Sequence, residues 1–268
     1  MTRTTRNNLT MSLNLLPRHA VVTLNWLNQH HVGPKLAYWY VKNGLLLKLG
    51  KEAFIRNGDY PSWAGVLNAL QKQLDLKVHV GGLTALQLQG LSHYVPLGKD
   101  LNVNLYINPN SRLPAWLKNV DPCDGNFVVH KNKIFEPHTY ALVDLKYEGV
   151  EVTASSPERA ILEVLYAVKT RPEYEAAYQL CENLNLLRPT YLQTLLANCT
   201  SIKAKRLLLY FGEEQQHPWV AKIDTSKLDL GSGKRRIAGG GKYSRKFDLL
   251  VPNLESEAEE YIKATGDF

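Results

Sequence analysis

The chain has 268 residues, of which 44% are hydrophobic and 21% charged, with a formal net charge of +7. This is the composition of a globular protein long enough for two domains. Because residues 1–10 are polar and no segment approaches the roughly 20 apolar residues of a membrane span, we expect a cytoplasmic protein without a membrane partner. The three cysteines show no CxxC spacing, so neither a disulfide framework nor a zinc site is expected.

The positive charge is concentrated in two parts of the chain. Residues 1–60 carry eight basic and two acidic side chains, and residues 227–246 carry seven basic and one acidic. Residues 61–226 are electrically balanced, and residues 247–268 are acidic. The distribution favours an anionic partner that meets a neutral body at two separate places.

The N-terminal part predicts three helices. Leucines at helical spacing in residues 8–17 indicate the first one. Thr23 is a suitable N-cap for the second. Gly33 and Pro34 then supply a tight turn and the first turn of a third helix, which is expected to stop at Gly44.

Two short runs, residues 45–49 and 53–56, follow the third helix and predict a hairpin. Helix, glycine turn, helix and hairpin is the order of a winged helix, whose second helix enters the major groove of DNA. A helix pair that only packs is the alternative, and the positive charge of the region favours DNA binding. The residues expected to point outward and contact DNA are Lys35, Tyr38, Trp39, Lys42, Asn43, Lys48, Lys51 and Arg56.

A change of pattern near Asp59 predicts a domain boundary. Residues 1–59 are expected to form a winged helix-turn-helix domain and residues 60–268 an α+β domain, so the fold class is α+β. The second domain is expected to open with a helix at 62–74 and to continue with a small mixed or antiparallel sheet. Its expected strands are 78–80, 101–107, 127–129 with 134–135 after a turn, and a hairpin of 141–146 with 150–153.

The last third of the chain predicts a helical bundle with a basic extension. Ser155 and Glu158 fit a capping box around Pro157, so a helix is expected to start there. Short spacers predict that the helices that follow are antiparallel neighbours. The expected later elements are helices at 172–183, 189–197 and 202–215, then either flexible Gly-rich loops or a wide hairpin between 228–230 and 247–251 with basic residues at its tip, and an acidic helix at 255–263.

The residues give no convincing catalytic set, and we expect no cofactor and no metal. Gly81-Gly82 between a strand and a helix is similar to the phosphate-facing turn of nucleotidyltransferases. That chemistry needs paired carboxylates on the next strand, where this chain has Asn102 and Asn104. A nucleic-acid-modifying enzyme with its active site in 80–110 is the alternative function, and an assay of metal-dependent nucleotide transfer separates the two.

Three segments stand in a specific order along residues 10–215: GPKLAYWYVKNGLLLKLGKEAFIRNGDYPSWAGVLNALQKQL, VHVGGLTALQLQGLSHYVPLG and VEVTASSPERAILEVL. In this order and spacing the chain resembles the AbiEi-type antitoxins of bacterial abortive-infection systems, which act in phage defence. The resemblance implies a non-catalytic antitoxin. It implies a winged-helix domain that represses its own operon by binding operator DNA, and a C-terminal domain that counteracts a cognate nucleotidyltransferase toxin.

By matching position, the resemblance makes Lys35–Asn43 the recognition helix, Lys48–Arg56 the wing and Ser156–Ala160 the start of a helix in the antitoxin domain. The basic segment 227–246 lies outside the resemblance. Three roles stay open for it: a solvated loop, a second contact with nucleic acid, or a contact with an acidic face of the toxin. Its candidate residues are Lys234, Arg235, Arg236, Lys242, Arg245 and Lys246.

Overall fold

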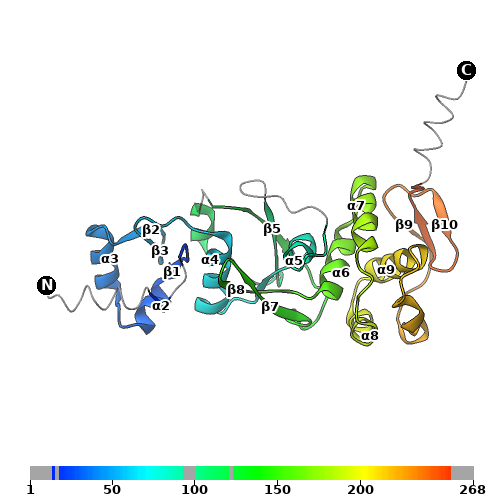
Figure 1. The fold of residues 1–268 in the computed structure, drawn as a ribbon, viewed down its shortest axis with the longest axis horizontal. Helices are drawn as coiled ribbons and strands as arrows, with labels where there is room; N and C mark the ends of the chain where they lie inside the picture. Colours follow the sequence, from blue (N-terminus) through cyan, green and yellow to red (C-terminus); the bar gives the residue numbers. More distant parts are fainter. Residues whose placement is uncertain (1–13, 16–17, 93–100, 121–122, 255–268) are drawn as a thin grey trace, which may run out of the picture. The chain divides into compact units, whose positions relative to one another are not determined.

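The computed structural model describes residues 14–15, 18–92, 101–120 and 123–254 (Figure 1). It contains two compact units, each assembled from separate stretches of the chain. The first comprises Met1–Leu88, Tyr94–Lys133 and Leu142–Ser155, and the second Gln89–His93, Ile134–Ala141 and Ser156–Phe268. The helices predicted at 8–17 and 255–263 fall outside the described residues, apart from residues 14–15, which form a turn. The fold class is α+β.

The first unit begins with two helices and a small sheet. Their bounds are β1 Val22–Thr23, α2 Leu24–Gln29, α3 Pro34–Lys42, β2 Leu46–Gly50 and β3 Ala53–Arg56. The three strands pair in the order β1-β3-β2. The paired hairpin and both helices lie where the sequence predicts them.

Local capping explains the ends of these two helices. Thr23 Oγ1 accepts a hydrogen bond from the Trp26 N–H at 3.2 Å and starts α2. Gly44 ends α3 at a φ of +67°, which a glycine adopts without a steric penalty. Its N–H bonds to the Val41 carbonyl and the next N–H, of Leu45, bonds to Tyr40, which is the Schellman pattern.

The rest of the first unit consists of a five-stranded mixed sheet and the helices that pack on it. Its strands are β4 Val78–Val80, β5 Asn102–Ile107, β6 Asn126–Lys131, β7 Leu142–Tyr147 and β8 Val150–Ser155, in the order β6-β5-β4-β8-β7. The predicted hairpin of β7 and β8 is confirmed. The predicted turn at 130–133 is wrong, because β6 continues in parallel register with β5 as far as Lys131. Ile134–Phe135 therefore is no return strand, and Phe135 makes only an isolated bridge with Cys199.

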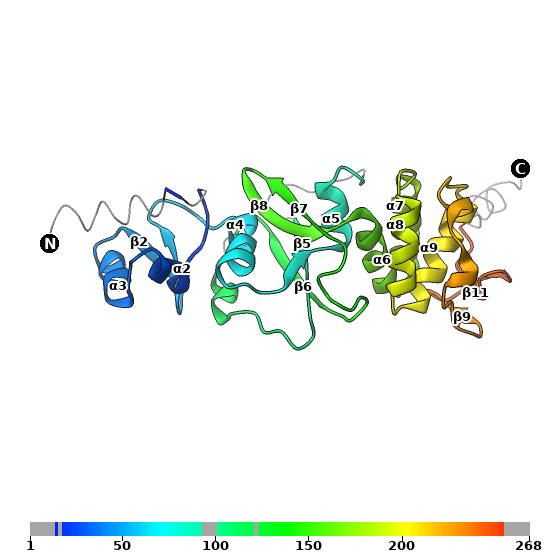
Figure 2. The same cartoon turned by 90° about the horizontal axis from the view of Figure 1, so that it is seen from below.

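Helices pack on this sheet (Figure 2). Helix α4, Trp63–Asn68, continues as a π-helical turn, Ala69–Gln73, and packs on β8. Helix α5, Gly82–Leu88, packs on β5 and β8, and a 3₁₀ helix spans Ala115–Asn119. The helix starts close to its predicted position, and Ser62 is its N-cap, because Ser62 Oγ accepts from the N–H of Gly65 at 3.0 Å.

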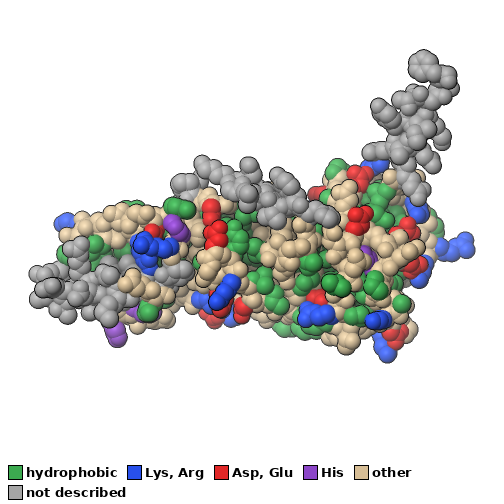
Figure 3. Space-filling view, viewed as in Figure 1, with side chains coloured by type: hydrophobic (Ala, Val, Ile, Leu, Met, Phe, Trp, Pro, Cys, Tyr) green, Lys and Arg blue, Asp and Glu red, His purple; other side chains and the backbone are tan. Residues whose placement is uncertain are grey.

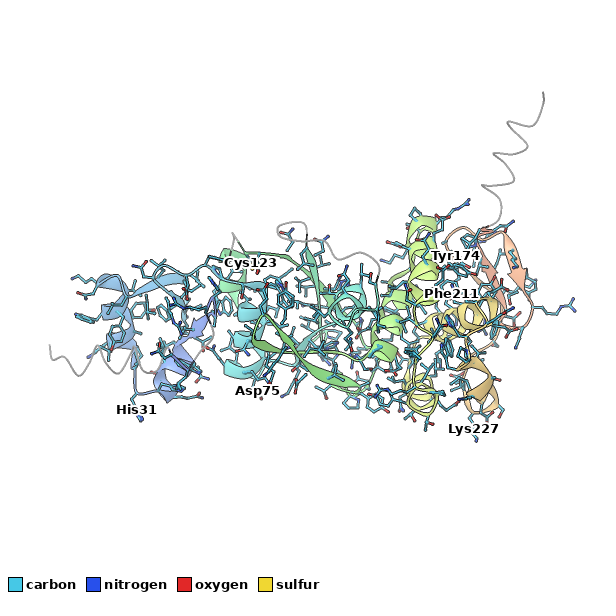
Figure 4. The ribbon with its side chains drawn as sticks, viewed as in Figure 1. His31, Asp75, Cys123, Tyr174, Phe211 and Lys227 are labelled. Carbon is cyan, nitrogen blue, oxygen red and sulfur yellow. The ribbon has the colours of Figure 1, made fainter. Side chains whose placement is uncertain are left out.

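The second unit is built around four helices: α6 Pro157–Ala167, α7 Arg171–Glu182, α8 Pro189–Asn198 and α9 Ile202–Glu214. Helix α9 is central, because every residue from Ala204 to Gly212 is buried. Its Phe211 meets Tyr174 of α7 edge to face, with ring centroids 5.1 Å apart (Figure 4). The predicted capping box at the start of α6 is wrong: Ser156 is the N-cap and accepts from the Arg159 N–H at 3.4 Å.

The chain ends, within the described residues, in a small sheet. Its strands are β9 Arg235–Arg236, β10 Lys242–Ser244 and β11 Leu249–Val251, in the order β10-β11-β9. Of the two alternatives for this segment, the hairpin that pairs 228–230 with 247–251 is wrong. The buried Arg206 takes the Leu230 carbonyl instead, at 2.6 Å from its Nε. The basic residues therefore do not gather at a hairpin tip, since Arg235 and Arg236 form a strand of their own.

Candidate nucleic-acid interface

Helix α3 places most of its predicted contact residues on the surface. Ala37 and Tyr40 are fully buried and fix the inward face of the helix. Lys35 and Lys42 are exposed, and the Tyr38 side chain is 42% exposed. Because these three positions follow an i, i+3, i+7 spacing, they share one face of α3.

Tyr38 connects this helix face to the hairpin. Its ring meets the buried Phe54 of β3 edge to face, with centroids 5.9 Å apart. The Nζ of Lys48, on β2, lies 5.4 Å from the centroid of the same ring. The exposed face of α3 and the outer side of β2 thus form one continuous surface.

Four lysines on α3 and on the β2–β3 hairpin with its turn are available to an anionic ligand. Their side chains are exposed, and the structure gives them no ion pair within residues 18–92 or elsewhere in the described chain. Phosphate groups are the natural partners of such unneutralised cations. These residues are Lys35, Lys42, Lys48 and Lys51.

Three residues predicted to contact DNA are engaged within the fold. Trp39 is only half exposed and packs against the core of the helix pair. The side-chain Nδ2 of Asn43 donates to the Trp39 carbonyl at 2.8 Å, at the C-terminal end of α3. Arg56 is half-buried at the end of β3, where burial lowers its pKa and the nearby charges of Asp59 and Arg18 act in opposite directions.

The six basic residues predicted in the Gly-rich segment divide into two groups. Lys242 pairs with Glu214 at 3.0 Å and Lys246 pairs with Glu213, both at the C-terminal end of α9. These two pairs tie the small sheet to the bundle. The other four are exposed, and their side chains have no acidic partner among the residues described: Lys234, Arg235, Arg236 and Arg245.

Tyr243 is the residue of this segment that sequence reasoning missed. It lies in β10 between the predicted residues Lys242 and Arg245 and is 40% exposed. An aromatic residue among clustered basic residues is a sequence pattern typical of contacts with nucleic-acid bases, so the sequence could have identified Tyr243.

The Gly81-Gly82 turn, which is similar to that of nucleotidyltransferases, lies beside side chains whose hydrogen bonds hold the fold together. Gly82 has a φ of +53°, and a Cβ there would lie 2.7 Å from the hydroxyl of Tyr106. Asn104 Nδ2 donates to Thr84 Oγ1 at 2.9 Å, while Asn104 Oδ1 lies 2.8 Å from Nε2 of His130. The side-chain amide of Asn104 therefore connects β5 to α5 and to β6 by hydrogen bonds.

The thiols and acidic residues show no reactive arrangement in the described part of the chain. Burial raises the pKa of Cys123 to about 12 and of Cys199 to about 11, and it also raises that of Cys181. These thiols stay protonated at neutral pH, where a nucleophile needs the thiolate. Among the described residues, no group of three or more His, Cys, Asp or Glu could hold a metal ion. No described helix is long and apolar enough to span a membrane.

The comparisons with known proteins assign the chain to a protein family. Residues 5–97 match the family model described as "Transcriptional regulator, AbiEi antitoxin N-terminal domain", which makes the chain a transcriptional regulator. Residues 100–252 match the model described as "Transcriptional regulator, AbiEi antitoxin, Type IV TA system". The chain belongs to the AbiEi antitoxin family, and the predicted resemblance is confirmed.

A solved structure shares the fold. The crystal structure of RV2827C protein from Mycobacterium tuberculosis superimposes with a TM-score of 0.58 at 16% sequence identity, over 94% of this chain and 92% of that one. No curated protein matches the chain.

Proposed function

We propose that this antitoxin represses its own operon by binding operator DNA through a winged helix formed by α2, α3 and the β2–β3 hairpin. The observation that carries the proposal is the set of four exposed lysines on α3 and the hairpin, which lack acidic partners in the part of the chain that the structure describes. Membership in a family of transcriptional regulators supports the same role.

The geometry suggests how the duplex is read. Helix α3 enters the major groove with Lys35, Tyr38 and Lys42 on its exposed face, as recognition helices do. Lys48 and Lys51 on the hairpin then meet the sugar–phosphate backbone. Contacts to phosphates position the protein, and Tyr38 is the residue of this face that can also touch a base edge.

A gel-shift titration with the chain's own promoter duplex tests this proposal. Affinity is expected to fall with rising salt by about 0.9 log units per decade for each phosphate contact. Lys35→Ala and Lys42→Ala should each reduce that slope by about one. Lys72→Ala is the matched control, because Lys72 lies in the same unit and is neutralised by Glu151 at 2.7 Å. Salt-insensitive binding, or an equal effect of Lys72→Ala, contradicts the proposal.

The antitoxin activity is proposed to counteract a nucleotidyltransferase toxin encoded beside it. The support is membership in a family of type IV antitoxins together with the resemblance on which the toxin class rests. Cells that express the product of the adjacent gene should stop growing, and co-expression of this chain should restore their growth. A pull-down between the two proteins decides whether they bind each other directly. If co-expression of the wild-type chain does not restore growth, this part of the proposal is contradicted.

A further inference from the structure

The outer face of the C-terminal sheet carries an exposed aromatic ring. Tyr243 of β10 lies opposite Leu250 of β11, and Leu250 lies opposite Arg236 of β9. Residues opposite one another in a ladder project to the same side of a sheet. Since Leu249 and Val251 are fully buried, the row of Tyr243, Leu250 and Arg236 faces outward.

The ring of Tyr243 is held in one orientation. Its hydroxyl donates to Asp248 Oδ1 at 2.6 Å, and Lys234 Nζ lies 4.6 Å from the ring centroid. The glycine-rich loop lies against the same row: a Cβ on Gly240, whose φ is +70°, would be 2.7 Å from Leu250 Cγ. A ligand that stacks on a fixed ring loses less conformational freedom than one that must order it.

Cations lie on both sides of this ring in the sequence. Lys234, Arg235 and Arg236 come from β9 and the residue before it, and Arg245 follows Tyr243 by two residues. All four are exposed and lack an ion pair among the described residues, in contrast to Lys242 and Lys246 on the same sheet. Figure 3 shows basic side chains projecting beside β9 and β10, at the right of the view.

We propose that this surface, the Tyr243 face (Lys234, Arg236, Tyr243 and Arg245), binds single-stranded nucleic acid. Arg235 is not part of it, because Arg235 lies opposite the buried Leu249 and so projects to the other side of the sheet. An unpaired base stacks on Tyr243, and the arginines neutralise the phosphates on either side. In a duplex the bases are already stacked on one another, so they leave no free face that could stack on the Tyr243 ring. A ring on a sheet beside a basic groove is how single-stranded chains are commonly recognised. The proposal does not depend on operator binding, because the Tyr243 face belongs to the second unit.

The test uses the full chain and fluorescence anisotropy with labelled oligouridine and oligothymidine of about 12 nucleotides, a length within the range that single-strand-binding folds cover. Tyr243→Ala should weaken binding roughly tenfold, whereas Tyr243→Phe keeps the ring and should bind like wild type. Arg236→Gln with Arg245→Gln should reduce the salt slope by about 1.4, at 0.7 per phosphate contact of a single strand. The two oligonucleotides together show whether RNA or DNA is preferred.

Two controls separate this site from others. Lys242→Gln with Lys246→Gln removes the same charge from the same sheet but from cations already paired, and it should change the slope less. Lys35→Ala with Lys42→Ala should weaken duplex binding and leave single-strand binding unchanged. The proposal is overturned by weak wild-type binding, by equal effects of the two double Gln variants, or by wild-type affinity of Tyr243→Ala. It is also overturned if the Arg236 and Arg245 variant binds single strands like wild type and loses only toxin protection, which would assign the face to a protein.

Discussion

Glu158 is a buried carboxylate in the first turn of α6, with a side chain only 2% exposed. Arg188 donates to it from Nε and Nη2, each at 2.9 Å, and the Arg188 backbone N–H adds a third bond at 3.1 Å. Burial alone raises the pKa of Glu158, but these donors outweigh burial and hold the pKa below its ordinary 4.5. A depressed pKa in the folded state means that the pair stabilises the fold above the unfolded pKa. That stability is lost as the pH falls through the folded pKa.

Arg188→Met is therefore expected to lower the free energy of unfolding at neutral pH by about 1–3 kcal/mol, because a buried carboxylate loses its two guanidinium donors and keeps only the backbone N–H. The deficit should shrink as the pH falls below 4.5, where Glu158 takes up a proton. Urea unfolding across this pH range measures both effects. Lys227→Met, which breaks an exposed pair with Asp224, should change little. A deficit that does not vary with pH argues against this account.

The same turn shows what a local pattern can and cannot predict. Pro157 after a serine correctly predicts the helix start, because proline suits the first helical turn. The predicted partner of Glu158 was the cap of its own helix, but the structure gives it Arg188, which is 30 residues away in the chain. A capping box does occur at Thr170 and Glu173, where both partners are local.

At the scale of elements, helices and the partners within hairpins were predictable, and the partners of strands far apart in the sequence were not. The ends of α8 and α9 lie within one residue of their predicted positions, because a helix satisfies its hydrogen bonds locally. Strands depend on distant partners. Residues 228–230 have a strand-like sequence, yet Arg206 takes the Leu230 carbonyl. On the candidate interface, the exposure of Lys35 and Lys42 followed from helical spacing and that of Lys48 and Lys51 from the predicted hairpin. The engagement of Arg56 near Asp59 and Arg18, in contrast, depends on contacts across the fold.

Gln73, at the end of the π-helical turn after α4, fastens this element to the strand that precedes α2. Its Nε2 donates to the Val21 carbonyl at 2.8 Å, and its Oε1 accepts from the Thr23 N–H at 2.8 Å. All three residues are buried. The side-chain amide of Gln73 thus gives the backbone of residues 21–23 the hydrogen-bond partners that an adjacent strand would otherwise supply.

Gln73→Leu is expected to destabilise the first unit by about 1–3 kcal/mol, because two buried backbone groups lose their partners without gaining water. Hydrogen exchange of the Thr23 amide should accelerate, which reports the change locally. Gln193→Leu is the matched control: Gln193 makes the same pair of bonds to the backbone of Asp224, but at the surface, so water can replace them. Equal losses from the two variants contradict this explanation.

At the scale of the whole molecule, each unit carries its own unneutralised cations: the four lysines of α3 and the hairpin in the first, and the Tyr243 face in the second. The charge distribution in the sequence predicts both places. The boundary at Asp59 stays a prediction, and a chain cut there loses close packing. Gly65 of α4 is so near the preceding chain that a Cβ would lie 2.4 Å from the His19 carbonyl oxygen. Point variants in the full chain therefore test the division of function more cleanly than truncation.

Repression and protection are expected to separate in such variants. Lys35→Ala with Lys42→Ala should lose repression, since two phosphate contacts contribute about two units of salt slope, while a cell that carries the toxin stays protected. Arg236→Gln with Arg245→Gln should keep repression, because the proposed operator contacts lie in the first unit. A promoter reporter and a growth assay with the toxin measure the two activities, and immunoblots confirm equal protein levels. If either variant loses both activities at normal abundance, the two surfaces do not act independently.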